Sequence, residues 1–451
     1  MNLVIFNFFF VISNVYVAGT SKNISGDVFK FDLTKFVNGL GYQMETHNID
    51  TEDGYKLECH RVSITKYANT DKPVVLLWHG FLGSSADFFH IGTGKSLPLR
   101  LADEGYDVWV GNNRGNSWGR QHKTLNPDTD EEFWDFSLDE LALYDVSSTI
   151  DYILKITGND RISFIGHSTG ASQFFILTST RPEYNEKIKV MAALAPVVYM
   201  NHTTNLLLNF VNPVDYPAIL AAEKSLNLTE ILPHLKILNT GLDLVCRIDK
   251  IKELCSAVLF FLTGFDKTQI TQINVRNLFR SFPAGTSTKN LNHFLQLKLT
   301  GNFARYDYGK IKNLDIYDSI DPPSYNLSAI SVPIGIYYGE NDLIVSLVDT
   351  ERLIEDLPNV IEDHIIDYKR FSHLGFLIAD NTDDFVNYYV INTLNKYNDK
   401  EEITSSSSTT TEIPTTQSTS STTTAGVVRN VFSGYLFIIP IIVHLFNRRL
   451  M

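Results

Sequence analysis

A serine flanked by glycines is the first feature of the sequence that could do chemistry. The pentapeptide 166–170 follows the apolar run 162–165 and precedes the helix-like run 171–178. A serine on a tight strand-to-helix turn lies in strained backbone, and flanking glycines let strand and helix pack closely there. Such a turn exposes the hydroxyl as a nucleophile, whereas the alternative is a glycine-rich turn whose serine only caps the helix. The predicted nucleophile elbow comprises Gly166, His167, Ser168, Thr169 and Gly170.

A serine nucleophile requires a histidine base, and a carboxylate must orient that histidine. After a turn of this type the partners follow in the order serine, acid, histidine. Asp342 lies just past the apolar run 334–338, and His373 lies in the loop after the predicted last strand, 360–366. We therefore predict that Ser168, Asp342 and His373 act as nucleophile, orienting acid and base. Glu340 is the rival acid, and either acid could instead cap a turn.

The reaction of such a serine passes through an oxyanion, which two backbone N–H groups would stabilise. One donor comes from the residue after the nucleophile, which is Thr169. The second comes from the loop after the third strand, where Gly80 frees the backbone to turn and Phe81 can direct its N–H inward. We predict Phe81 and Thr169 as the oxyanion hole. The alternative for the first loop is an ordinary glycine turn.

Short apolar runs separated by helical patterns would position these residues. A run too short for a helix and apolar throughout is typical of a strand buried on both faces. Apolar residues at helical spacing occupy 143–154 and end at Gly158. Strand–helix–strand repetition predicts an α/β fold with a mostly parallel sheet flanked by helices. The predicted strands are 74–78, 106–110, 162–165, 191–195, 334–338 and 360–366.

The segment 199–333 is too long for a loop of such a fold, so it must have structure of its own. Its apolar residues follow a mostly helical pattern, which predicts a helical cap above the carboxyl edge of the sheet, where open α/β sheets bind ligands. Cys246 and Cys255 both lie in this cap. In an oxidising compartment they would form a disulfide, and the alternative is two buried thiols. Cys59 is then expected to be a buried, inert thiol.

Composition excludes several classes of protein. The chain has 451 residues, 44% of them hydrophobic and 20% charged, which excludes disorder along its whole length. A net charge of −13 has the wrong sign for a nucleic-acid-binding surface. Three cysteines are too few for a disulfide scaffold, and no set of Cys and His has the spacing of a zinc site. We expect no metal and no cofactor.

The N-terminal end predicts entry into the secretory pathway. A short apolar stretch that ends in small residues at 17–19 is typical of a cleaved signal peptide, although it lacks a basic residue before the apolar run. The alternative is an uncleaved membrane anchor. Sequons for N-glycosylation, which would agree with a secreted chain, occur at Asn23, Asn201, Asn227 and Asn326.

The C-terminal end predicts a tether. Residues 404–424 are nearly all Ser and Thr, which indicates a disordered, O-glycosylated stalk. The apolar run 431–446 is shorter than the roughly 20 residues of a spanning helix. Small residues, a polar spacer and this run match a signal for a glycosylphosphatidylinositol anchor. The alternative is a retained transmembrane helix, which the terminal Arg448-Arg449 pair favours.

Taken in order, these motifs resemble the acid lipase family, which includes gastric lipase and lysosomal acid lipase, in its insect-like branch. The resemblance covers most of 41–395. It includes an opening motif at 41–61, the segments 79–87 and 105–116, Phe133-Trp134, and the cap motif 283–296. The spacing of Cys246 and Cys255 also matches the family's disulfide. The family implies an α/β-hydrolase fold with a helical cap and the hydrolysis of neutral-lipid esters, triacylglycerols or sterol esters, at a lipid–water interface without cofactor or metal.

Three positions depart from the family pattern. Thr169 stands where many relatives have Gln, Phe81 replaces the usual Leu, and Gly375 stands where relatives often have Asp. The first two leave the backbone donors in place. The third leaves open how the His373 loop is supported. None of the three removes a member of the predicted proton relay.

The expected function is therefore a serine ester hydrolase that cleaves lipid esters through an acyl-enzyme on Ser168. A membrane-tethered, catalytically silent adhesion or lipid-carrier module is the alternative, as is a carboxylesterase for small soluble esters. The expected organisation is a signal peptide at 1–19, core at 20–198, cap at 199–333, core at 334–400, stalk at 401–430 and a hydrophobic tail at 431–451.

Overall fold

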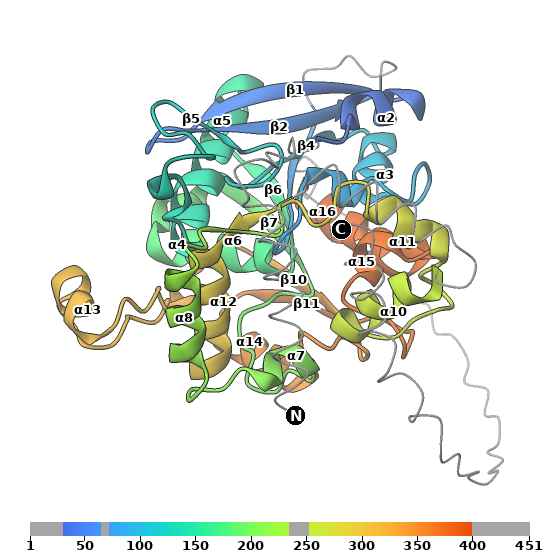
Figure 1. The fold of residues 1–451 in the computed structure, drawn as a ribbon. Coiled ribbons are helices and arrows are strands. Elements are labelled where there is room, and N and C mark those ends of the chain that lie inside the picture. The colour runs from blue at the N-terminus through green and yellow to red at the C-terminus, as the bar shows by residue number, and fades with distance from the viewer. Residues whose placement is uncertain (1–29, 65–71, 234–251, 399–451) are drawn as a thin grey trace, which may run out of the picture. The chain divides into compact units, whose positions relative to one another are not determined.

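A nine-stranded sheet runs through the residues that the computed structural model describes, which are 30–64, 72–233 and 252–398 (Figure 1). All of them belong to one compact unit, 26–399. The strand order is β1-β2-β4-β3-β6-β7-β10-β11, with β5 paired to β2. The strands are β1 (Gln43–Asp50), β2 (Tyr55–Ser63), β3 (Val74–Trp78), β4 (Asp107–Val110), β5 (Gln121–His122), β6 (Ile162–His167), β7 (Ile188–Leu194), β10 (Ile334–Tyr338) and β11 (Val360–Ile365).

Neighbouring strands from β4 to β11 pair in parallel, whereas β1, β2 and β5 pair antiparallel. All five side chains of β3 are buried, as a central strand requires. Parallel neighbours place their carboxyl ends at one edge of the sheet. The loops that follow β3, β6, β10 and β11 therefore meet at that edge, and these loops carry the predicted site residues.

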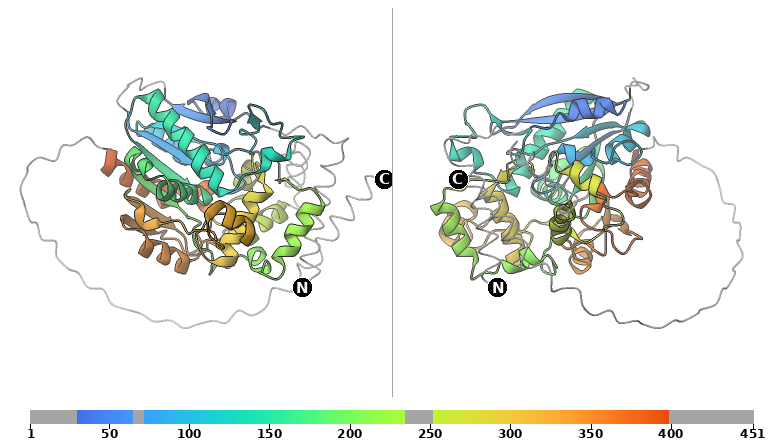
Figure 2. Two further views of the ribbon diagram at one scale, coloured as in Figure 1. Left: turned by 90° about the vertical axis from the view of Figure 1, so that its left-hand side faces the viewer. Right: turned by 45° about the vertical axis from the view of Figure 1, so that its right-hand side comes forward.

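Helices cover both faces of the sheet (Figures 1 and 2). One buried apolar cluster joins the sheet to α2 (Leu33–Gly39), α3 (Leu97–Asp103), α15 (Gly375–Ile378) and α16 (Tyr388–Asn398). The opposite cluster joins it to α4 (Leu138–Glu140), α5 (Ser147–Thr157), α6 (Thr169–Thr180) and α14 (Leu347–Asp356). A π-helical turn, Leu141–Val146, connects α4 to α5. Gly158 ends α5 in the left-handed conformation, φ 71°, as its position in the sequence predicts.

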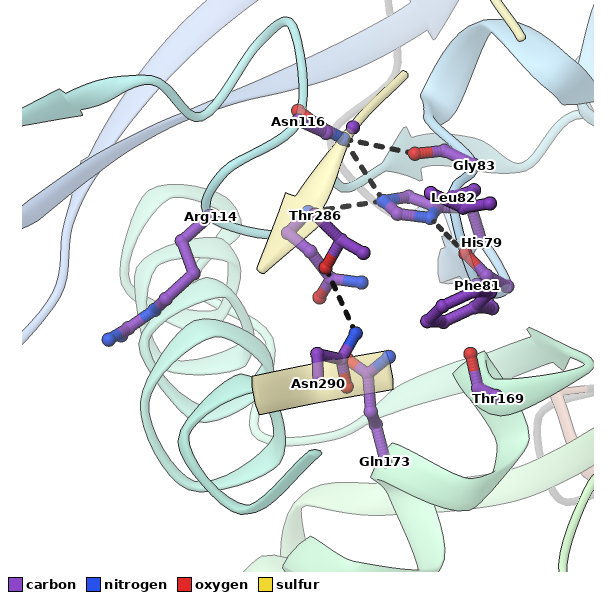
Figure 3. Close-up of a pocket in the computed structure, with 13 residues that line it drawn as sticks. His79, Phe81, Leu82, Gly83, Arg114, Asn116, Thr169, Gln173, Thr286 and Asn290 are labelled. Carbon is purple, nitrogen blue, oxygen red and sulfur yellow. Dashed lines mark hydrogen bonds between the residues drawn. The ribbon is translucent and has the colours of Figure 1, made fainter. Parts of the chain in front are cut away.

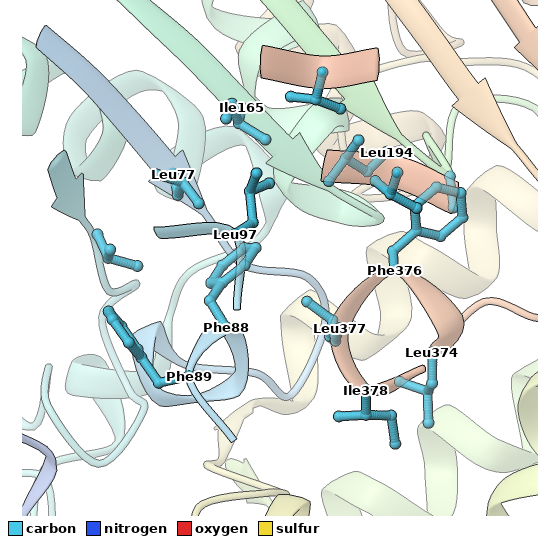
Figure 4. Close-up of a cluster of buried hydrophobic side chains, with 14 of the residues drawn as sticks. Leu77, Phe88, Phe89, Leu97, Ile165, Leu194, Leu374, Phe376, Leu377 and Ile378 are labelled. Carbon is cyan, nitrogen blue, oxygen red and sulfur yellow. The ribbon is translucent and has the colours of Figure 1, made fainter. Parts of the chain in front are cut away.

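The short helix α15 anchors the loop that carries His373. Phe376, Leu377 and Ile378 pack in the same buried cluster as Leu77 and Ile165 from the central strands (Figure 4). Phe376 and Ile378 are at most 2% exposed. Burying a large apolar side chain stabilises a fold by roughly 1.5–3 kcal/mol. The C-terminal side of the His373 loop is therefore fixed to the sheet by core packing.

Between β7 and β10 lies the segment predicted as a cap. Its described part is mostly helical, with a two-stranded antiparallel sheet of β8 (Glu230–Ile231) and β9 (Thr286–Ser287). It contacts loops at the carboxyl edge, for example through Ala284 N–H, which donates to Leu82 O. Its division from the core at 199 and 333 stays a prediction. The helices are α7 (Leu206–Phe210), α8 (Tyr216–Ser225), α10 (Lys252–Thr263), α11 (Gln272–Leu278), α12 (Thr288–Thr300) and α13 (Lys310–Tyr317).

The antiparallel strands β1, β2 and β5 at the edge of the sheet were not predicted from the sequence. Tyr55, Leu57 and Cys59 alternate on the buried face of β2, and the turn before this strand contains Asp53-Gly54. This is a hairpin pattern that a search for continuous apolar runs does not detect. The strand β7 also begins at Ile188, three residues earlier than predicted, because Lys189 interrupts the apolar run.

The predicted signal peptide, stalk and hydrophobic tail lie outside the described residues. Within the described parts, every helix is too short or too polar to cross a bilayer.

Candidate active site

Ser168 lies at the sharp turn between β6 and α6. Its backbone has φ 57° and ψ −124°, a strained conformation for a residue with a side chain. A Cβ atom at Gly166 would lie 2.7 Å from Ala171 N, and one at Gly170 would lie 2.4 Å from Trp78 O. Only glycine fits at either position, because strand, turn and helix are in backbone contact there. The pentapeptide therefore forms the tight turn that its sequence predicts.

The structure brings Ser168, His373 and Asp342 into one hydrogen-bonded chain. His373 Nε2 lies 2.9 Å from Ser168 Oγ, and His373 Nδ1 lies 2.7 Å from Asp342 Oδ2. All three residues are buried, at 4–5% exposed. The carboxylate accepts from Nδ1–H, which leaves Nε2 to accept the serine proton. The rival acid Glu340 is exposed and is not part of this chain.

Asp342 is held by the backbone that follows it. Its Oδ1 accepts from Ile344 N–H at 2.8 Å and from Val345 N–H at 2.9 Å. These bonds fix the carboxylate, and the other oxygen is left for the histidine.

The backbone of His373 is fixed from two sides. Its N–H donates to Thr263 O at 3.1 Å, and its carbonyl oxygen accepts from His167 Nε2–H at 3.1 Å. The first partner comes from the cap segment and the second from the nucleophile strand. Burial, followed by the neighbouring His373, holds the pKa of His167 well below its ordinary value, so His167 is neutral. The sequence predicted His167 only as part of the turn, and its contact with the base was missed.

The His373 loop is supported although Gly375 has no side chain that could hold it. A Cβ atom there would lie 2.9 Å from the ring of Phe371. Its N–H donates to Ser372 O at 2.8 Å. The support that the sequence left open comes instead from α15 packing, from Thr263 and from His167.

The predicted oxyanion loop approaches the nucleophile closely. A Cβ atom at Gly80 would lie 2.7 Å from Ser168 Cβ. Among the described residues, the backbone N–H groups of Phe81 and Thr169 donate to no protein acceptor. The Phe81 ring stacks on Phe294 of α12, with centroids 5.2 Å apart. One uncommitted donor thus belongs to the serine turn, and the other to the loop that lies against it.

A buried imidazole, which the sequence analysis missed, orients this loop. His79 Nδ1–H donates to Gly80 O at 2.8 Å. Its Nε2 accepts from Asn113 N–H and from Asn116 Nδ2–H, at 3.1 and 3.2 Å. Burial lowers the pKa of His79 to about 4, so the ring is neutral at higher pH with its proton on Nδ1. The bond to Gly80 O fixes the plane of the Gly80–Phe81 peptide and thereby the direction of the Phe81 N–H.

A small polar pocket of about 10 Å³ adjoins the loop, large enough for roughly one water molecule (Figure 3). Phe81 and Thr169 line it, with Gln173 from α6 and Asn290 from the cap segment. Gln173 Oε1 accepts from Trp78 Nε1–H at 2.7 Å. Residues of the oxyanion loop, of α6 and of the cap segment thus line one polar pocket.

The remaining predicted positions lie apart from this site. Asn201, Asn227 and Asn326 are exposed, and Asn23 lies outside the described residues. The Cys246–Cys255 pair also lies outside them, since 246 is not described and neither is the Cys255 side chain. Cys59 is buried, and burial raises the pKa of its thiol, as expected of an inert cysteine. Within the described segments, no cluster of acidic, His and Cys side chains could hold a metal ion.

Comparison with known proteins places the chain in a family. The family described as the alpha/beta hydrolase fold matches residues 73–376, and the partial alpha/beta-hydrolase lipase region matches residues 33–92. Lipase 1 of Drosophila melanogaster is 37% identical, across 79% of this chain and 78% of that protein. The chain belongs to the acid lipase family of α/β-hydrolases. With 37% identity across 79% of its length to a lipase, this chain is an enzyme of the lipase class.

Two vertebrate relatives are similar over a comparable length. Gastric triacylglycerol lipase of Homo sapiens is 36% identical, across 81% of this chain and 93% of that protein. Lysosomal acid lipase/cholesteryl ester hydrolase of Macaca fascicularis is 34% identical, across 81% of this chain and 91% of that protein. The family resemblance expected from the sequence motifs is confirmed, as is the α/β-hydrolase fold.

Proposed function

We propose that this lipase hydrolyses neutral-lipid esters through an acyl-enzyme on Ser168. The observation that carries the proposal is the chain of two hydrogen bonds from Ser168 Oγ through His373 to Asp342, at 2.9 and 2.7 Å. A serine hydroxyl is a weak nucleophile until a base accepts its proton, and this geometry provides that base.

In the first half of the reaction, Ser168 Oγ bonds to the ester carbonyl carbon while its proton moves to His373 Nε2. The carbonyl oxygen becomes an oxyanion that accepts from the Phe81 and Thr169 N–H groups. Each such donor lowers the barrier by about 3 kcal/mol. The bond to the alcohol oxygen then breaks, and His373 returns its proton to the departing alkoxide. Asp342 accepts from His373 Nδ1–H and stabilises the imidazolium throughout.

In the second half, water attacks the acyl carbon. His373 accepts a proton from the water, the bond between the acyl carbon and Ser168 Oγ breaks, and the proton returns to the serine. The products are a fatty acid and an alcohol.

Apolar side chains of the cap segment support a lipid substrate. The stacked rings of Phe81 and Phe294 provide apolar surface where the oxyanion loop meets the cap segment. Relatives at 34–36% identity carry the names triacylglycerol lipase and cholesteryl ester hydrolase. Exposed apolar residues on this segment would contact a lipid surface, as large exposed apolar groups commonly mark such contacts. They include Leu206, Leu226, Phe261, Phe265 and Ile273.

The proposal includes entry into the secretory pathway. The apolar start of the chain and three exposed sequons within the described residues support it. Mobility of the secreted protein after treatment with peptide N-glycosidase tests it, and unchanged mobility would contradict glycosylation. The membrane tether stays a prediction from residues 431–451, tested by release with phosphatidylinositol-specific phospholipase C.

Ser168→Ala separates the enzyme from a silent binding module. We expect the variant to lose hydrolysis of emulsified trioleoylglycerol and cholesteryl oleate while it keeps the thermal unfolding curve of the wild type. Ser172→Ala, in the same helix but outside the hydrogen-bonded chain, is the matched control and keeps activity. Equal hydrolysis by Ser168→Ala would refute the mechanism, and a wild-type preference for acetate over oleate esters would refute the lipid substrate.

A further inference from the structure

The C-terminal end of the cap helix α10 is hydrogen-bonded to both loops that carry the proposed base and acid. Thr263 O accepts from the N–H of His373 at 3.1 Å. Phe265 O accepts from Asn341 Nδ2–H at 3.1 Å, and Asn341 directly precedes Asp342. We call Thr263, Gly264, Phe265 and Asn341 the junction. The junction contains two hydrogen bonds: one joins Thr263 to His373, and the other joins Phe265 to Asn341, the residue before Asp342.

Asn341 also links the two loops to each other. Its amide donates to Arg370 O at 2.9 Å, and its backbone N–H lies 3.3 Å from Phe371 O. One side chain thus connects the acid loop, the base loop and the cap segment. Removing this side chain would delete one hydrogen bond to the cap segment and one to the base loop.

Gly264 brings the cap backbone into contact with these loops. Its φ of 115° lies in the region that favours glycine. A Cβ atom there would lie 2.0 Å from Asn341 O and 2.8 Å from the Cβ of Ser372, the residue before His373. Real Cβ atoms do not approach backbone oxygens so closely. Any side chain at this position must therefore displace the acid loop, the base loop or the end of α10.

Further contacts from the cap segment surround the base loop. Tyr368 Oη–H donates to Asp266 Oδ1 at 3.0 Å on one side of His373. On the other side, Asn274 Nδ2–H donates to Ile378 O at 2.9 Å. The end of α10 is therefore part of a continuous contact between cap segment and base loop.

We infer that the junction positions His373, so that the chemical step requires this end of the cap to stay docked. The inference rests on the proposed function of His373. The imidazole must satisfy hydrogen bonds of 2.7 and 2.9 Å at once, and a misplacement of about 1 Å costs roughly 100-fold in rate.

Gly264→Ala is the first test, with Gly309→Ala as matched control. Gly309 lies in the same cap segment with φ 85°, and a Cβ atom there meets nothing within 4 Å. Both variants carry the backbone strain, but only Gly264→Ala displaces the loops. On a short-chain soluble ester we expect Gly264→Ala to lose roughly 10- to 100-fold in kcat with KM little changed, and Gly309→Ala to match the wild type.

A double-mutant cycle distinguishes positioning from a general structural role. The second-order rate of labelling by a fluorophosphonate probe is measured for wild type, Gly264→Ala, His373→Ala and the double variant. If Gly264 acts through His373, the glycine substitution slows the wild type but adds no loss when His373 is already absent. Equal loss in both backgrounds would overturn the inference.

Asn341→Ala provides a second variant if Gly264→Ala does not fold. It removes both amide donations without introducing a clash, and Asn359→Ala, which removes an amide donation to Ser331 O, is its control. We expect Asn341→Ala to slow labelling when His373 is present but not when His373 is replaced by Ala. Asn359→Ala should show no such dependence on His373. If the wild type is labelled and both junction variants are labelled at the same rate, the inference is refuted while the proposed function stands. If the wild type is not labelled at all, the proposed function is refuted.

Discussion

At the scale of single residues, the arrangement of the site explains why each residue type is needed. Ser168 occupies a strained turn that only flanking glycines permit. Asp342 has one oxygen held by two backbone N–H groups and the other on the imidazole. These side chains could be predicted from the sequence, because a glycine-flanked serine marks the nucleophile and the acid and histidine follow it in a fixed order. It could not predict Thr263 or His167 as supports of the base, because one bond uses a backbone atom and the other spans 206 positions.

Asp342→Asn tests the orienting role at this scale. An amide that donates to Nδ1 would stabilise the tautomer with its proton on Nε2, which cannot accept the serine proton. We expect kcat to fall by about four orders of magnitude, the loss known for the equivalent change in a serine protease, with little change in folding. Glu340→Gln is the control and keeps activity. A greater loss in Glu340→Gln would show that the acid has been misassigned.

At the scale of elements, the carboxyl edge of the parallel strands brings the site together. The loops after β3, β6, β10 and β11 carry the proposed oxyanion donor, nucleophile, acid and base respectively. Short apolar runs predicted β3, β6 and β10, and the segment 360–366 was predicted as the last strand although Glu362, Asp363 and His364 interrupt its apolar residues. Such runs did not predict the hairpin of β1 and β2, whose burial alternates, nor β8 and β9, which are too short to leave a pattern.

Gly80→Ala tests the close approach of the β3 loop to the nucleophile turn. The added methyl group would lie 2.7 Å from Ser168 Cβ and must push the loop away. We expect a loss of roughly 100- to 1000-fold in kcat, as when one oxyanion donor is removed. Gly39→Ala, where a Cβ meets nothing within 4 Å, controls for the substitution itself. Wild-type turnover by Gly80→Ala would mean that the loop supplies no donor.

At the scale of the whole molecule, a buried polar chain links the core to the cap segment beyond the active site. Ser281 Oγ–H donates to Asp87 Oδ1 at 3.1 Å, and His90 Nε2 lies 2.7 Å from Ser281 Oγ. Asp87 also accepts from Ser84 N–H at 2.9 Å. Burial raises the pKa of Asp87 to about 7. No sequence pattern pairs Asp87 with Ser281, since the contact exists only after the cap segment has folded onto the core.

This raised pKa predicts that the folded state is more stable in acid. Protonated Asp87 contributes stability that is fully present below the unfolded pKa of about 4 and is lost as the pH rises through about 7. Asp87→Asn should therefore flatten the pH dependence of the unfolding free energy between about pH 4 and pH 7. Urea unfolding across this range measures it. The same slope in wild type and variant would contradict the assignment.

The central claim is that Ser168 is activated by His373. Peptide mapping by mass spectrometry after labelling with a fluorophosphonate probe tests it most directly. The account predicts one adduct, on the peptide that contains Ser168, and its near absence in His373→Ala protein that retains the wild-type unfolding curve. An adduct on another residue, or labelling of Ser168 at an unchanged rate without His373, would contradict it.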